Sequence, residues 1–130
     1  MLGEIIIEEQ GQVVVRRVLP DHSVETSFQT TGKVLGVDSR NIGTYTSRMG
    51  PGGTLYGEGQ GIAITSDGAM VTWKGIGRGK ITAGGGVSYR GSIAYETESP
   101  KFARLNTVVG VFEYEVSPEG AASAKTWEWK

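Results

Sequence analysis

One short stretch of the chain holds the residues best suited to chemistry. In "YGEGQGI", Tyr56, Glu58, Gln60 and Ile62 occupy every second position, with glycines between them. A period of two is typical of a β-strand, in which alternate side chains point to the same face. Burial on the inner face of a folded sheet would raise the pKa of Glu58, so Glu58 is our candidate general acid or base. Tyrosine hydroxyls beside it would donate hydrogen bonds to a developing oxyanion.

Other kinds of catalytic or metal site have few residues available. The chain has no cysteine and one histidine, His22, which follows Pro20 and Asp21. This setting predicts a surface turn for His22. The carboxylates do not cluster with metal-ligand spacing, and the glycine-rich stretches match neither a dinucleotide-binding fingerprint nor a P-loop. We therefore expect no metal and no cofactor.

The composition favours a globular β protein. The chain has 130 residues, of which 38% are hydrophobic and 21% charged, and this size predicts a single domain over residues 1–130. It contains 21 glycines and is rich in Val, Ile and Thr, whereas long stretches with helical periodicity are scarce. The net charge of −1 argues against nucleic acid and anionic membranes as partners. With no signal-peptide pattern and no apolar span of about 20 residues, we expect a cytoplasmic protein.

Turn signals at regular spacing predict about eight to ten strands in an antiparallel meander that closes into a barrel. The predicted breaks are a hairpin at Gln10-Gly11, turns at 20–23, 49–53, 67–68, 84–86 and 118–120, and a short helix within "SPKFARLN".

The register around the glycines defines the predicted site. A two-residue hairpin at Asp67-Gly68 pairs Ser66 with Ala69, so that Glu58 lies opposite Gly77. For the next turn we predict a three-residue loop at 84–86, because this register pairs Lys74 with Glu96. A two-residue loop would put Trp73 beside Glu96. The resulting inner face carries the candidate ligand-binding residues, which are Tyr56, Glu58, Gln60, Ile62, Trp73, Gly77, Tyr89 and Tyr95.

The glycines of the second strand leave space over the backbone of this inner face. That space suits a pocket for a small, largely apolar molecule. Alternatively, Glu58 and Gln60 lie hydrated near the rim or bond to the tyrosines as a structural network.

The opposite face carries a basic stripe. It consists of Lys74, Arg78, Lys80 and Arg90. The predicted register sets Lys80 opposite Arg90, a contact that an anion would relieve, or that the flexible side chains relieve by splaying into water. Aromatic residues do not alternate with these charges, which argues further against single-stranded nucleic acid.

The C-terminal part predicts two more strands. Val108, Gly110, Phe112, Tyr114 and Val116 should point inward. A three-residue turn at 118–120 would pair Glu113 with Lys125 and place Trp127 and Trp129 on the outer face. There the tryptophans would cover a subunit interface or close the barrel against the first strand, and the alternative register turns them inward over Gly110. We expect a homo-oligomer.

The succession "LYGEGQGIAITSDGAMVTWKGIGRG" and "VSYRGSIAYET" resembles the small calycin-type barrels, in particular allene-oxide-cyclase-like proteins and their uncharacterised bacterial relatives. The resemblance extends over about residues 24–130 and lies in the strand rhythm. It implies an antiparallel barrel, an apolar lumen and self-association. The lipocalin G-x-W signature is absent, and no catalytic residue of such a family can be matched.

Three functions follow from these patterns. The first is the binding of a small apolar molecule in the barrel. The second is a cofactor-free isomerase or cyclase that uses Glu58. The third is a structural or interaction module that uses the outer face with Ile76, Trp127 and Trp129.

Overall fold

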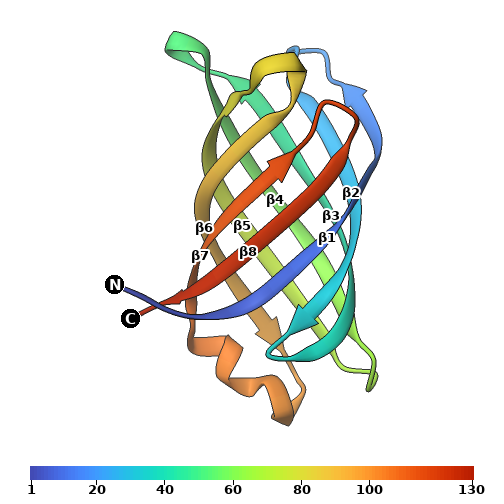
Figure 1. Ribbon diagram of the computed structural model, residues 1–130, viewed down its shortest axis with the longest axis vertical. Coiled ribbons are helices and arrows are strands. Elements are labelled where there is room, and N and C mark those ends of the chain that lie inside the picture. The colour runs from blue at the N-terminus through green and yellow to red at the C-terminus, as the bar shows by residue number, and fades with distance from the viewer.

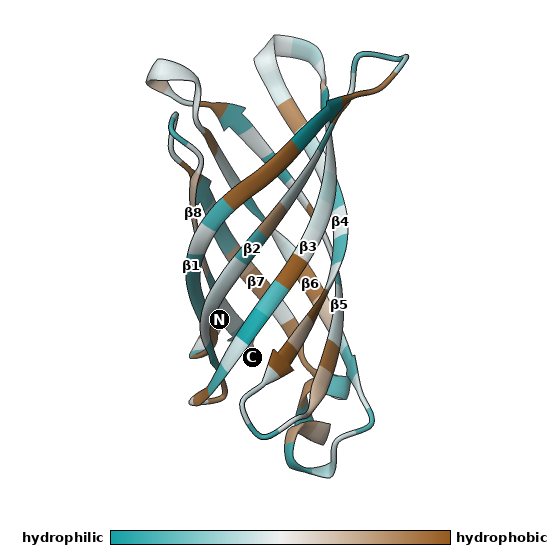
Figure 2. Ribbon diagram, turned by 90° about the vertical axis from the view of Figure 1, so that its right-hand side faces the viewer, coloured by the Kyte–Doolittle hydropathy of each residue, from teal (hydrophilic) through white to brown (hydrophobic).

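The computed structural model describes residues 1–130 and shows eight antiparallel strands that close into a barrel in meander order, with β8 paired to β1 (Figure 1). This confirms the predicted all-β class and barrel. The strands are β1 (Leu2–Val18), β2 (Val24–Val34), β3 (Val37–Met49), β4 (Thr54–Thr65), β5 (Met70–Ile81), β6 (Val87–Thr97), β7 (Val109–Val116) and β8 (Ala121–Trp129). Apolar and polar segments alternate along strands such as β1 and β3 (Figure 2), as expected for strands with one buried face.

The two ends of the barrel differ. The lower end in Figure 1 holds both termini and the 3₁₀ helix η3 (Pro100–Thr107), which confirms the predicted helical segment. Its side chains Phe102 and Leu105 are fully buried and pack with Ile6, Val34 and Val71. This cluster closes the lower end.

The same type of turn recurs in the chain. Five connections close with an N–H to carbonyl bond between residues four apart, at Leu19–Ser23, Gly50–Thr54, Thr65–Ala69, Thr82–Gly86 and Ser117–Ala121. The fourth residue of each has a positive φ, as in three-residue hairpin loops with a left-handed final residue. This residue is glycine in four of them and His22, with φ of 67°, in the first. His22 therefore lies in an exposed turn, as predicted.

The predicted register at Asp67-Gly68 is wrong by one residue. Ser66, Asp67 and Gly68 together form the loop, in which Thr65 and Ala69 are the closing residues and Gly68 takes the left-handed conformation. Ile64 consequently pairs with Met70. A shift of one residue exchanges the inner and outer faces of the strand. The side chains predicted inside therefore lie on the outer face, namely Tyr56, Glu58, Gln60 and Ile62.

In the observed register, glycines lie opposite each other across β4 and β5. Gly57 pairs with Gly77 and Gly59 with Gly75. Aromatic rings of the interior pack directly on the bare backbone of this wall. A Cβ added at Gly61 would lie 2.4 Å from the ring of Trp73, and one at Gly57 would lie 2.9 Å from the ring of Tyr89. The glycines therefore serve the packing of the barrel core.

The predicted hairpin at Gln10-Gly11 does not exist, because β1 runs through it without a break. Gly11 instead permits close contact with β2, since a Cβ there would lie 2.0 Å from the carbonyl oxygen of Gln29. Further along, the pairing with β2 shifts between Val13 and Val15, which marks a β-bulge.

The loop between β5 and β6 has three residues, as predicted, but it lies at 83–85 and not at 84–86, with Thr82 bonded to Gly86 and Ile81 paired to Val87. The pairs shift by two residues, so the predicted faces of both strands are right. The individual pairs are wrong, because Lys74 faces Ala94 and Arg78, not Lys80, faces Arg90.

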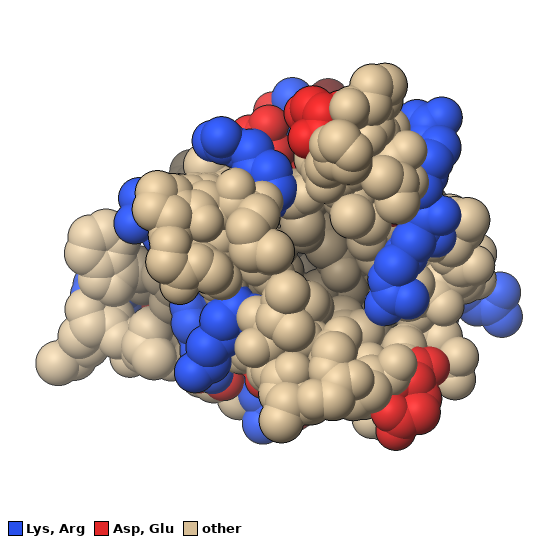
Figure 3. All heavy atoms as spheres, turned by 90° about the horizontal axis from the view of Figure 1, so that it is seen from above, with Lys and Arg blue, Asp and Glu red and all other residues tan.

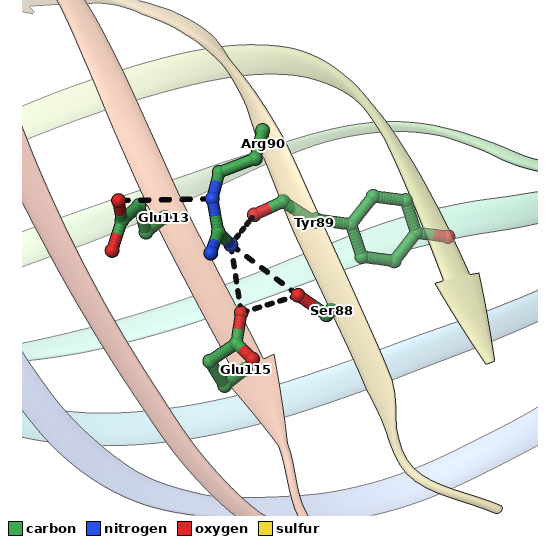
Figure 4. A network of polar contacts seen from close by, with 5 residues as sticks. All are labelled: Ser88, Tyr89, Arg90, Glu113 and Glu115. Atoms are coloured by element: carbon green, nitrogen blue, oxygen red, sulfur yellow. Dashed lines mark hydrogen bonds and ion pairs between the residues drawn. The ribbon is translucent and has the colours of Figure 1, made fainter. Parts of the chain in front are cut away.

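Glutamates of β7 neutralise Arg90 on the outer face, as Figure 4 shows. Its guanidinium contacts Glu115 at 2.8 Å and Glu113 at 3.7 Å, and also reaches Ser88. The guanidinium of Arg78 instead lies over the ring of Tyr56, 5.1 Å from its centroid. The predicted basic stripe is thus on the outer face, but the arginine pair within it needs no bound anion.

In the last two strands the three-residue turn at 118–120 sets the register, which is one of the two alternatives that the sequence left open. Glu113 pairs with Lys125, and the predicted inward set of β7 is buried or half-buried. Trp127 pairs with Ile5 of β1, and Trp129 pairs with Leu2. The tryptophans therefore lie on the outer face where β8 meets β1, and Trp129 is 60% exposed.

Candidate functional site

A cavity of about 90 Å³ lies inside the barrel, where all eight strands contribute to its wall. It borders both hydrophobic clusters of the core, one near η3 and one in the upper half. Its aromatic lining consists of Phe28, Tyr45, Trp73, Tyr89, Tyr95, Phe112 and Tyr114. The glycines of β4 and β5 form the bare side of the wall.

The structure brings together half of the predicted ligand-binding residues. Trp73, Gly77, Tyr89 and Tyr95 line the cavity. Tyr56, Glu58, Gln60 and Ile62 do not reach it with their side chains. The segment of β4 around Glu58 forms part of the wall, but its carboxyl is exposed on the outer surface. Glu58 therefore cannot serve as an acid or base inside the barrel.

The acid inside the cavity is Glu9 of β1, which sequence reasoning missed. Burial raises its pKa from the ordinary value of 4.5 to about 7, while hydrogen bonds from Thr30 and Asn41 act in the opposite direction. The signal was present, because Ile7, Glu9, Gly11 and Val13 alternate as one inner face. The assumed hairpin at Gln10-Gly11 interrupted that pattern.

A chain of hydrogen bonds positions the Glu9 carboxyl. The indole Nε1 of Trp73 donates to Oδ1 of Asn41 over 2.8 Å. Because the indole is only a donor, it orients the amide so that Nδ2 of Asn41 donates to Glu9 over 3.1 Å. Asn41 is buried, and the chain links β5, β3 and β1 across the lumen.

Tyr95 brings an unsatisfied polar group to the same cavity. Its hydroxyl is buried and faces Thr126 without a hydrogen bond of normal geometry. Burial raises the pKa of Tyr95, and the nearby Glu9 carboxylate raises it further. A buried polar atom without a partner is uncommon in proteins and calls for a specific explanation.

Three more tyrosines form a layer between the cavity and the upper end. The Tyr114 hydroxyl donates to that of Tyr45 over 3.3 Å, and Tyr89 shares a hydrogen bond of 2.5 Å with Ser47. The rings of Tyr45 and Tyr114 meet edge to face with centroids 5.4 Å apart. Burial raises the pKa of both phenols, so they remain neutral donors and acceptors.

The charge of one arginine, which follows the bulge in β1, acts on this layer. Beyond the bulge, Arg16 pairs with the inward-facing Thr26. The positive charge of Arg16 partly offsets the effect of burial on the pKa of Tyr45 and Tyr114. Figure 3 looks onto this end and shows a hollow at its centre, with Lys and Arg side chains and some Asp and Glu side chains around it.

Some kinds of site are not formed. No group of three or more His, Cys, Asp or Glu side chains is arranged to hold a metal ion. No helix has the length and apolar character needed to cross a membrane.

Three solved structures share this fold. A protein of unknown function from Clostridium acetobutylicum superposes with a TM-score of 0.82 at 14% identity, covering 96% of each chain. A conserved protein of unknown function from Rhodopseudomonas palustris gives 0.80 at 13% identity, over 98% of this chain and 97% of the other. A beta-barrel like protein from Acinetobacter baumannii gives 0.79 at 16% identity, over 100% and 96%.

No protein-family model matches the chain, and no curated protein matches its sequence. At these identities the structural similarity shows the fold alone. The chain is a small eight-stranded β-barrel protein of the kind found in these bacterial proteins.

Proposed function

We propose that the protein binds a small, largely apolar molecule inside the barrel. The observation that carries this proposal is the cavity, which combines an aromatic wall with the Glu9 carboxyl and an unpartnered Tyr95 hydroxyl. A cavity that served packing alone would be dry and apolar, without a carboxyl and an unpartnered hydroxyl at its wall.

The volume limits the ligand. A cavity of about 150 Å³ holds benzene, and drug-sized ligands need roughly 300–1,000 Å³. The 90 Å³ found here therefore suits a molecule of a few heavy atoms, or a larger one for which the tyrosine layer moves aside.

Isobutanol is a suitable neutral probe. We expect its addition to shift the amide NMR signals of Gly75 and Gly77 and the indole signal of Trp73. Gly75→Ala should weaken binding, because its added methyl group points into the cavity with contacts no shorter than 3.4 Å. Ser92→Thr adds a methyl group to the outer face of β6 and is the matched control. Equal affinity in both variants, or no saturable shift in the wild type, would contradict the proposal.

The second candidate is a cofactor-free isomerase or cyclase, in which Glu9 takes the role that the sequence suggested for Glu58. A carboxyl whose pKa is about 7 exchanges protons readily at neutral pH, which favours general acid–base catalysis. Glu9→Gln should then abolish turnover of a substrate while isobutanol still binds. Turnover retained in Glu9→Gln would exclude this mechanism.

We also propose that the outer face where β8 meets β1 mediates self-association. Trp129, Leu2 and Ile5 are 60%, 56% and 45% exposed there, which is costly for neighbouring apolar side chains. Light scattering after size-exclusion chromatography should show an oligomer that Trp129→Lys dissociates, and a monomeric wild type would refute this. The calycin-type relationship and the cytoplasmic location stay predictions.

A further inference from the structure

The polar groups that face the cavity are mostly acceptors. Both ends of the Asn41 amide are used, by Trp73 on one side and by Glu9 and Thr30 on the other. Glu9 accepts hydrogen bonds from Asn41 and Thr30, which leave further acceptor sites free on its two carboxyl oxygens. The polar groups still able to bond a ligand are the Glu9 carboxyl oxygens, the Tyr95 hydroxyl and the neighbouring Thr126 hydroxyl. This set is complementary to a head group that donates several hydrogen bonds.

The cavity also lacks a cation. No lysine, arginine or histidine lines it, and Glu9 forms no ion pair. Arg16, whose charge acts on Tyr45 and Tyr114, is exposed and does not line the cavity. A negatively charged ligand would meet Glu9 inside the barrel without a compensating charge.

The wall has the chemistry that attracts cations. Seven aromatic rings surround the lumen, and the negative face of an aromatic ring attracts a cation most strongly where water is excluded. Such rings together with a carboxylate recognise an ammonium group better than a neutral one.

We infer that the ligand is a compact organic amine, bound as its ammonium ion with the head group at Glu9 and Tyr95 and its short apolar body against the aromatic wall. This inference rests on the proposed function and specifies its ligand class. The ammonium donates to a Glu9 oxygen and to the unpartnered hydroxyl. The volume of 90 Å³ excludes long-chain amines in this state of the barrel.

Three probes with one branched body test the inference, namely isobutylamine, isobutanol and isobutyrate. Calorimetric or NMR titration between pH 6 and pH 8 gives the dissociation constant of each. Isobutylamine stays protonated over this range, as alkylamines have a pKa near 10. The phenols of Tyr95, Tyr114, Tyr45 and Tyr89 face the cavity and stay neutral there, because burial raises the pKa of each. Glu9 is therefore the group inside the cavity whose charge changes over this range.

We expect isobutylamine to bind more tightly than isobutanol, and isobutyrate not to bind. Because the pKa of Glu9 is about 7, its ionised fraction rises by roughly tenfold from pH 6 to pH 8, and the affinity for isobutylamine should rise by about the same factor. Glu9→Gln should lower that affinity by at least about tenfold, since a hydrogen bond to a charged group is lost. Glu58→Gln, which removes an exposed carboxyl of the outer face, is the matched control and should have no effect.

The outcomes separate the two proposals. If isobutanol binds as tightly as isobutylamine, or if the amine affinity does not rise with pH, the amine inference is wrong and the proposed binding of a small apolar molecule stands. If none of the probes binds saturably, both are wrong. The pH profile of the wild type decides the matter even if Glu9→Gln fails to fold.

Discussion

Replacement of Glu9 by Gln should change how the stability of the protein depends on pH. The carboxyl has a pKa of about 7 in the folded protein against an ordinary value of 4.5. Since the folded pKa is the higher one, the unfolded chain loses this proton first as the pH rises. The free energy of unfolding therefore falls between pH 4.5 and pH 7 and levels off above pH 7.

The size of the effect follows from the two pKa values. At 1.36 kcal/mol for each pH unit, the difference between 4.5 and about 7 corresponds to roughly 3 kcal/mol. A glutamine keeps the shape and still accepts the hydrogen bond from Asn41, but it does not titrate. Glu9→Gln should therefore be more stable than the wild type above pH 7, and the two should converge near pH 4.5.

Urea unfolding followed by tryptophan fluorescence, at several values between pH 4.5 and pH 8, measures this difference. Glu58→Gln is the control, because its carboxyl is exposed. Parallel curves for the wild type and Glu9→Gln, within about 0.5 kcal/mol over the whole range, would show that Glu9 is not buried in the barrel.

Three further predictions concern packing and turns, each measured by urea unfolding. Gly61→Ala should lower the free energy of unfolding by about 1–3 kcal/mol, because the new methyl group would lie 2.4 Å from the Trp73 ring. An unchanged free energy of unfolding would contradict the packing of that ring on β4. Phe102→Ala should lower the free energy of unfolding by about 3–5 kcal/mol, because Phe102 is 1% exposed and fills the lower end of the barrel. Ala103→Ser, at an exposed position, is the control. Equal stability of the two variants would show that η3 does not close the barrel. His22→Gly should gain up to about 1 kcal/mol by relieving a positive φ of 67°, and a loss of stability would mean that the His22 side chain contributes contacts of its own.

Much of the fold could be predicted because it is encoded locally. Residues of alternating polarity form strands wherever one face is buried, and the inward positions of β7, of Trp73 in β5 and of the tyrosines in β6 followed from that alternation. The turn at 20–23 and the helical segment that begins at Pro100 could also be predicted, because Pro, Asp and Ser occur there. Even the misplaced loop between β5 and β6 preserved the faces, because moving a three-residue loop by one position shifts each cross-strand pair by two residues.

The candidate site could be predicted only in part, since it depends on which loop length Asp67-Gly68 adopts. An Asp-Gly pair suits a two-residue loop and equally the end of a three-residue loop, and the two differ by one residue. That residue moved Glu58 from the lumen to the surface. At Gln10-Gly11 the local turn signal was misleading, because Gly11 is required for close contact between β1 and β2.

By itself, the sequence determined most of the strands, most of the turns and an aromatic lumen, but it placed the wrong acid, Glu58, inside. The tertiary structure decided which acid lies inside, Glu9 and not Glu58, and joined it to Asn41, Trp73 and Tyr95 from other strands. The physical reason is that side chains from all the strands of a closed barrel pack against one another in the same interior. The rings of Trp73 and Tyr89 need bare backbone on β4, so the register that places glycines inward is selected by contacts between residues far apart in the chain.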